Sequence, residues 1–122
     1  MNEITNTTVK KYDLEERTFN FAKRINEYVN KLSKTITNIE NGKQLARSAG
    51  SVGANYIEAN NALSKKDFMM RIRISKKEAK ESYFWIRLSE PGISQLYEKD
   101  ALLKEAMELV KILGSIVEKS KV

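Results

Sequence analysis

Four polar residues recur at the spacing of one helical face in the middle of the sequence. Ser48, Ser51, Asn55 and Glu58 are separated by steps of three, four and three residues, so on an α-helix they form a single polar stripe. Small hydroxyls, an amide that donates and accepts, and a carboxylate that can pair with a lysine or arginine can together build a hydrogen-bond network. The polar stripe is therefore either a semi-buried network against a neighbouring helix or a solvated face.

A second face of the same stretch consists of small residues and one isoleucine. This small-residue face lies about a quarter-turn from the apolar face of the helix and comprises Ala46, Gly50, Gly53 and Ile57. Two glycines inside a helix cost about 2 kcal/mol relative to alanine, so a close contact should offset them. We expect that contact to be with another helix of the same chain or with a second subunit. Only a narrow strip is left for solvent, near Lys43, Arg47, Ala54 and Asn61.

Catalytic and metal chemistry have few candidate residues in this chain. The sequence contains no cysteine, which excludes disulfides and thiolate nucleophiles, and no histidine, the commonest metal ligand and general base. The Glu-x-x-His pairs of di-iron bundles are therefore absent. Nothing in the spacing of Glu58, Glu78 and Glu81 singles out a metal site or an acid–base pair. We therefore expect no enzymatic activity, no cofactor and no metal.

Basic residues concentrate between positions 65 and 87, where eight lysines and arginines stand against three acidic residues in a chain of net charge +6. Five of them lie on or beside one helical stripe, the basic stripe: Arg73, Lys76, Lys77, Lys80 and Arg87. This stripe is either a solvated charged face or a surface that contacts phosphates. Phe84 or Trp85 nearby would stack on bases or fill an interface. The sequence has no motif for recognising particular bases, so we expect recognition by shape and charge.

Two predicted helices precede the basic segment. Apolar residues at alternating steps of four and three, from Leu14 to Leu32, predict the first helix after a polar tail at about 1–11. Polar residues and a glycine place the connection within 33–41. The second helix is predicted over about 42–62, with Leu45, Ala49, Val52, Tyr56, Ala59 and Leu63 on its apolar face.

Two further helices complete a single predicted domain over residues 1–122. Ser64 is predicted to cap a third helix that ends near Ser89, before Pro91 and Gly92, and the fourth helix covers about 95–119. Four helices with short connections predict an all-α, antiparallel, up-down-up-down four-helix bundle. No apolar run suits a signal peptide or a membrane span, so we expect a cytoplasmic protein with no membrane contact.

The segments 13–25 and 45–88 closely resemble the 23S rRNA intervening-sequence protein family, also called four-helix bundle proteins. The pattern Ser-x-x-Ser-x-x-x-Asn-x-x-Glu of the polar stripe matches the signature of that family, and Glu81 occupies its acidic position in the third helix. The resemblance implies a bacterial four-helix bundle that assembles into a homopentamer and has no established enzymatic activity. A similar accessory protein of diversity-generating retroelements is basic and binds nucleic acid and a reverse transcriptase.

These observations together predict the function and the partners of the chain. We expect a non-enzymatic homo-oligomer that binds nucleic acid, with RNA favoured over DNA, through the basic stripe. The alternative is a protein-interaction scaffold or accessory subunit that does not contact nucleic acid directly. Its partners would be other copies of itself, RNA or DNA, or a second protein.

Overall fold

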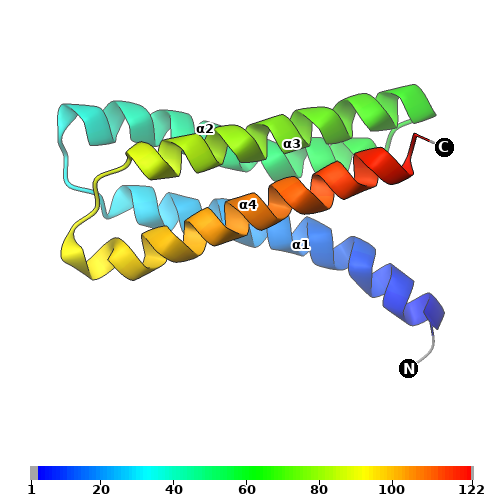
Figure 1. Cartoon of the computed structure of the whole chain (residues 1–122), viewed down its shortest axis with the longest axis horizontal. Helices are drawn as coiled ribbons and strands as arrows, with labels where there is room; N and C mark the ends of the chain where they lie inside the picture. The colour runs from blue at the N-terminus through cyan, green and yellow to red at the C-terminus, as the bar shows by residue number, and fades with distance from the viewer. Residues whose placement is uncertain (1–2, 122) are drawn as a thin grey trace.

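The computed structural model describes the backbone of residues 3–121 and the side chains of residues 14–121. Its elements are α1 (Glu3–Asn30), α2 (Ile36–Asn60), α3 (Lys65–Leu88), the short 3-10 helix η1 (Ile93–Gln95) and α4 (Leu96–Lys119). Successive long helices lie side by side and run in alternating directions (Figure 1). The described residues contain no strand, so the predicted all-α fold is confirmed.

Helix α1 begins earlier than the sequence predicted. Its backbone is helical from Glu3, so the helix includes most of the segment 1–11 that was expected to be a polar tail. Neither glycine nor proline occurs between Glu3 and Asn30, and therefore no residue interrupts the helix on the N-terminal side of its apolar face. The first turns of α1 diverge from the other three helices (Figure 1).

Helix α2 also begins earlier, at Ile36 rather than near residue 42. Thr35 caps it, because the Thr35 side chain accepts a hydrogen bond of 3.1 Å from the backbone N–H of Asn38. The buried amide of Asn38 donates to the carbonyl oxygens of Ser33 and Glu90 and accepts from the Glu90 N–H at 3.0 Å. The connection is therefore shorter than predicted, since these bonds stabilise helix in a segment of weak helix formers.

Helix α2 ends at Asn60, and the predicted core position of Leu63 is wrong. Leu63 is 99% exposed because the chain has left the helix before it reaches this residue. The predicted start of α3 is confirmed, since the Ser64 hydroxyl accepts a hydrogen bond of 3.1 Å from the backbone N–H of Asp67. Helices α3 and α4 end close to their predicted limits.

The core lies between the four helices and, apart from Leu63, contains the apolar positions predicted for α1 and α2. Helix α1 contributes Leu14, Phe21, Ile25, Tyr28 and Leu32, together with the buried Thr18. Helix α2 contributes Leu45, Ala49, Val52, Tyr56 and Ala59. The buried apolar residues of α3 and α4 are Ile72, Ala79, Ile86, Leu102, Ala106, Leu109, Leu113 and Val117. Within the described residues, no helix has the length and apolar content needed to span a membrane.

Ion pairs hold α1 against α4. Arg17 binds Glu105 at 2.8 Å and Glu108 at 3.0 Å, and Arg24 binds Glu98 at 3.1 Å. The hydrogen bonds to Glu105 and Glu98 raise the pKa of Arg17 and Arg24, respectively, above the ordinary arginine value. Both guanidinium groups therefore stay charged and are committed to contacts within the chain.

Candidate functional site

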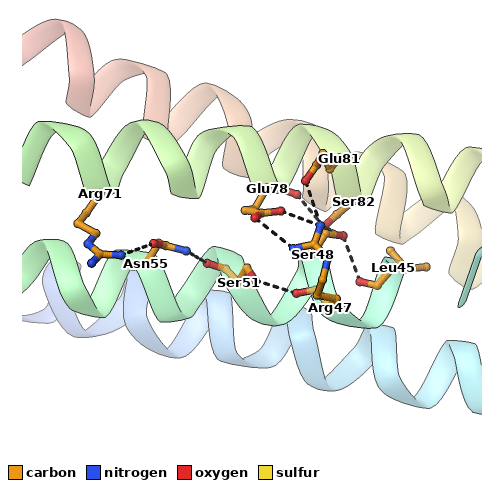
Figure 2. A network of polar contacts seen from close by, with 9 residues as sticks. All are labelled: Leu45, Arg47, Ser48, Ser51, Asn55, Arg71, Glu78, Glu81 and Ser82. Carbon is orange, nitrogen blue, oxygen red and sulfur yellow. Dashed lines mark hydrogen bonds and ion pairs between the residues drawn. The ribbon is translucent and has the colours of Figure 1, made fainter. Parts of the chain in front are cut away.

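A buried set of small hydroxyl groups lies between α2 and α3, where Ser48 of α2 meets Ser82 of α3 (Figure 2). The Ser82 hydroxyl donates to the carbonyl oxygen of Glu78 at 2.9 Å and lies 2.9 Å from the Ser48 hydroxyl. On the same edge of α3, the Ser75 hydroxyl donates to the carbonyl oxygen of Val52 at 2.7 Å. All three serines are fully buried. Their small side chains let the helices approach closely while each hydroxyl keeps a hydrogen-bond partner.

Arg47 connects α2 to two acidic residues of α3 (Figure 2). Its guanidinium lies 3.3 Å from the carboxylate of Glu78 and 3.2 Å from that of Glu81. Burial raises the pKa of Glu78, and the neighbouring Glu81 raises it further. The contact with Glu78, followed by the contact with Arg47, lowers the pKa of Glu81. The two carboxylates and Arg47 therefore form one coupled ionic cluster on the α2–α3 edge.

The remaining polar-stripe residues differ in their contacts. The amide oxygen of Asn55 accepts a hydrogen bond of 3.1 Å from Arg71, and its amide nitrogen donates to the carbonyl oxygen of Ser51. The Ser51 hydroxyl donates to the carbonyl oxygen of Arg47. Glu58 is exposed and forms no ion pair or hydrogen bond with any described residue. Arg71 of α3 thus binds Asn55 rather than Glu58.

The sequence did not predict that Arg47 and Glu78 belong to the ionic cluster on the α2–α3 edge. Arg47 was placed on the solvent strip, and it is half exposed, but its long side chain reaches across to α3. The sequence did contain one signal, the glutamates at positions 78 and 81. They share a helix face, where two like charges repel one another unless a cation lies nearby.

The small-residue face divides into an inner and an outer part. A Cβ atom at Gly53 would lie 3.0 Å from Oγ1 of Thr18, so glycine at this position allows α1 to pack closely against α2. A Cβ atom at Gly50 would meet nothing within 4 Å. Ile57 is 47% exposed and Ala46 is half-buried. Gly53 thus makes a contact inside the chain, while Gly50 and Ile57 lie on the outer surface of α2.

The basic stripe lies on the opposite edge of α3, towards α4. Arg73, Lys77, Lys80 and Arg87 are exposed and Lys76 is half-buried, and none of the five side chains forms an ion pair or hydrogen bond with a described residue. All except Arg87 line a groove of about 430 Å³ between α3 and the end of α4. The aliphatic part of Lys76 passes Gly114 of α4, where a Cβ atom would lie 3.5 Å from its Cε.

One acidic residue, Glu118, also lines this groove. It binds Lys121 at 2.6 Å, and that contact, together with Lys76 and Arg73, lowers the pKa of Glu118. The groove therefore keeps an excess of positive charge even with Glu118 ionised. Among the described residues there is no group of three or more acidic, histidine or cysteine side chains that could hold a metal ion. The chemistry that this surface offers is electrostatic attraction of an anion.

Comparisons with known proteins agree with the fold. The family model described as 23S rRNA-intervening sequence protein matches residues 10–115. A solved structure from Bacteroides thetaiotaomicron VPI-5482, described as a protein of unknown function from the S23 ribosomal protein family, is similar with a TM-score of 0.73 and 29% identity. That match covers 89% of this chain and 98% of the other. A comparison with curated proteins finds no match. The chain therefore belongs to the 23S rRNA-intervening sequence protein family.

Proposed function

We propose that this protein is a non-enzymatic, cytoplasmic homo-oligomer that binds nucleic acid, with RNA favoured over DNA, through the basic stripe. The observation that supports this proposal is the uneven pairing of charges on α3. Arg71, Glu78 and Glu81 all have partners on α2. The five cations of the basic stripe form no ion pair within the described residues, and all of them except Arg87 line the same groove. Such a row attracts phosphates by releasing their condensed counterions.

The outer surface of α2 supports the oligomer proposal. Gly50 and Ile57 are exposed there, and no described residue would touch a Cβ atom placed at Gly50. A small residue beside an apolar one lets a second helix approach closely and bury apolar surface. A pentamer of the kind the family resemblance implies would carry a charge of about +30 by addition, which would strengthen its attraction for a polyanion.

Binding can be tested by fluorescence anisotropy with a structured RNA across a salt series. If five phosphates are contacted, log K should fall with log salt with a slope between about −3.5 and −4.5.

Substituting Arg73→Gln, Lys77→Gln and Lys80→Gln together should abolish most of the affinity for RNA. The matched control, Lys23→Gln with Lys104→Gln and Lys111→Gln, removes the same charge from exposed sites on α1 and α4. Equal losses in both triple variants would contradict the location, and no binding to RNA or DNA at about 50 mM salt would reject the function.

Light scattering tests the subunit contact. Ile57→Asp places a charge on the proposed contact surface and should dissociate the oligomer into smaller species. Leu63→Asp is the matched control, because Leu63 is fully exposed in the α2–α3 connection and lies outside the proposed contact. A monomeric parent protein, or an Ile57→Asp variant of unchanged mass, would contradict this proposal.

A protein-interaction scaffold is the second candidate function. The observation that favours it is the exposure of three apolar side chains, Ile36 at the start of α2, Ile93 in η1 and Tyr97 at the start of α4. Helices α2 and α4 begin at the same end of the bundle (Figure 1). Exposed apolar groups of this kind are common where proteins bind one another. A co-purifying protein that survives nuclease treatment and is lost in Ile93→Asp would favour the scaffold over the nucleic-acid proposal.

A further inference from the structure

The basic groove extends beyond the part lined by the basic stripe. A second hollow of about 770 Å³ adjoins the groove and shares Arg73, Lys77 and Lys121 with it. Three apolar side chains contribute to this second hollow: Met69, Met70 and Ile74. The α3–α4 surface therefore combines cationic side chains with an apolar part at one end. We call this apolar part, formed by Met69, Met70 and Ile74, the Met70–Ile74 floor.

An exposed aromatic ring continues the same face of α3 in the other direction. Phe84 is 51% exposed and follows Lys77 by seven residues, which places it on the same side of the helix. Lys80 and Arg87, at the −4 and +3 positions relative to Phe84, are its neighbours on the helix surface. The ring packs edge-on against Trp85 with a centroid distance of 4.9 Å, and Trp85 in turn packs on the core. Phe84 is thus supported on one side while half of its surface remains open.

The combination of apolar surface and cations distinguishes between two forms of nucleic acid. A duplex presents phosphates on its outside and keeps its base faces stacked inside, so it would leave the Met70–Ile74 floor and Phe84 uncovered. A single strand exposes base faces that stack on apolar and aromatic side chains while its phosphates contact cations. The face from Met70 to Phe84 is about 21 Å long, calculated from the helical rise. That length suits a short single-stranded site.

We propose that this α3–α4 surface binds a single-stranded segment of nucleic acid. Phosphates contact Arg73, Lys77 and Lys80, one base packs on the Met70–Ile74 floor, and another stacks on Phe84. This inference rests on the proposed nucleic-acid binding and adds the form of nucleic acid that is recognised. A structured RNA would be held at a loop or an unpaired end.

The test compares a uridine 12-mer with an RNA duplex of 12 base pairs by fluorescence anisotropy at one salt concentration, using the full chain. The single strand should bind about ten-fold more tightly. Phe84→Ala and Met70→Ala should each weaken single-strand binding by about five-fold or more and change duplex binding by less than about two-fold. Phe19→Ala is the matched control, because Phe19 is 60% exposed on α1, and it should change neither affinity.

Trp85 provides an independent readout, since it is the sole tryptophan of the chain and touches Phe84. The uridine strand should change its emission and saturate at the concentration found by anisotropy, whereas the duplex should leave the emission unchanged. Duplex binding as tight as single-strand binding, or an unchanged Trp85 emission, would overturn this inference and leave the proposed function in place. Failure of both nucleic acids to bind would overturn both.

Discussion

The two edges of α3 differ in how their polar groups are paired. Towards α2, small hydroxyls and the ionic cluster of Arg47, Glu78 and Glu81 find their partners within the chain. Towards α4, the basic stripe has no ion pairs with described residues. A satisfied polar edge fixes how two helices pack, whereas an unpaired charged edge adds little stability and keeps its charges available for a ligand. One helix thus pairs its polar groups within the chain on one edge and carries unpaired charges on the other.

The largest expected effect on stability comes from filling the α2–α3 edge. Ser48→Leu forces a larger side chain into a fully buried position beside Ser82 and should lower the free energy of unfolding by about 3 kcal/mol. Ser115→Leu makes the same change at an exposed site of α4 and should alter it by less than about 0.5 kcal/mol. Urea denaturation measures both values. Equal effects in the two variants would mean that the α2–α3 edge is not closely packed.

A smaller loss is expected when the contact between Asn55 and Arg71 is removed. Asn55→Ala should lower the free energy of unfolding by about 1 kcal/mol, because Arg71 and the carbonyl oxygen of Ser51 both lose a hydrogen-bond partner. Asn26→Ala, at an exposed site of α1, is the control for the better helix propensity of alanine, and it should be neutral or slightly stabilising. If the two variants do not differ, Asn55 is only a surface residue.

Sequence periodicity predicted most of the fold, because the apolar stripes and the cap at Ser64 are local patterns. The start of α2 was missed although Thr35 is a local cap, because part of what stabilises this segment comes from a distant residue. Asn38 binds the backbone of Glu90, which is far away in the sequence, and nothing near Asn38 reveals that partner. Leu63 was placed in the core because the helical periodicity was extended past Asn60, where α2 ends and the chain turns.

The candidate site was predicted less completely than the fold. The sequence placed Ser48 and Asn55 on one face but could not show that Arg47 reaches Glu78 across the helix interface, since a long side chain can turn either way. Gly50 and Gly53 were grouped together, yet residues three positions apart point in directions that differ by about 60°. That difference decides that Gly53 meets Thr18 while Gly50 faces outwards.

The pH dependence of stability tests the ionic cluster, because the pKa values of Glu78 and Glu81 shift in opposite directions. The raised pKa of Glu78 means that its ionisation costs stability as the pH rises above the ordinary glutamate value. The lowered pKa of Glu81 has the opposite sign, because the stability it contributes is present above the ordinary value and is lost as the pH falls through its folded pKa.

Glu78→Gln should therefore make the free energy of unfolding rise more steeply with pH than in the parent protein, and Glu81→Gln should make it rise less steeply. Urea denaturation between pH 3 and 7, about the range over which carboxylates titrate, measures the three curves. Parallel curves would show that the two carboxylates are not coupled to folding.

The smallest effect on stability is expected at the edge of α3 that faces α4. Arg73→Gln, Lys77→Gln and Lys80→Gln together remove three charges that make no ion pair with a described residue, so the free energy of unfolding should change by less than about 0.5 kcal/mol. If the triple variant is more stable than the parent, the increase in the free energy of unfolding should come from relief of repulsion between like charges. That increase should disappear at about 1 M salt, where screening is nearly complete. Urea denaturation at low and high salt measures the free energy of unfolding of both proteins. A loss above about 1 kcal/mol would mean that the basic stripe helps to hold α3 and α4 together, and the two edges would then share one structural role.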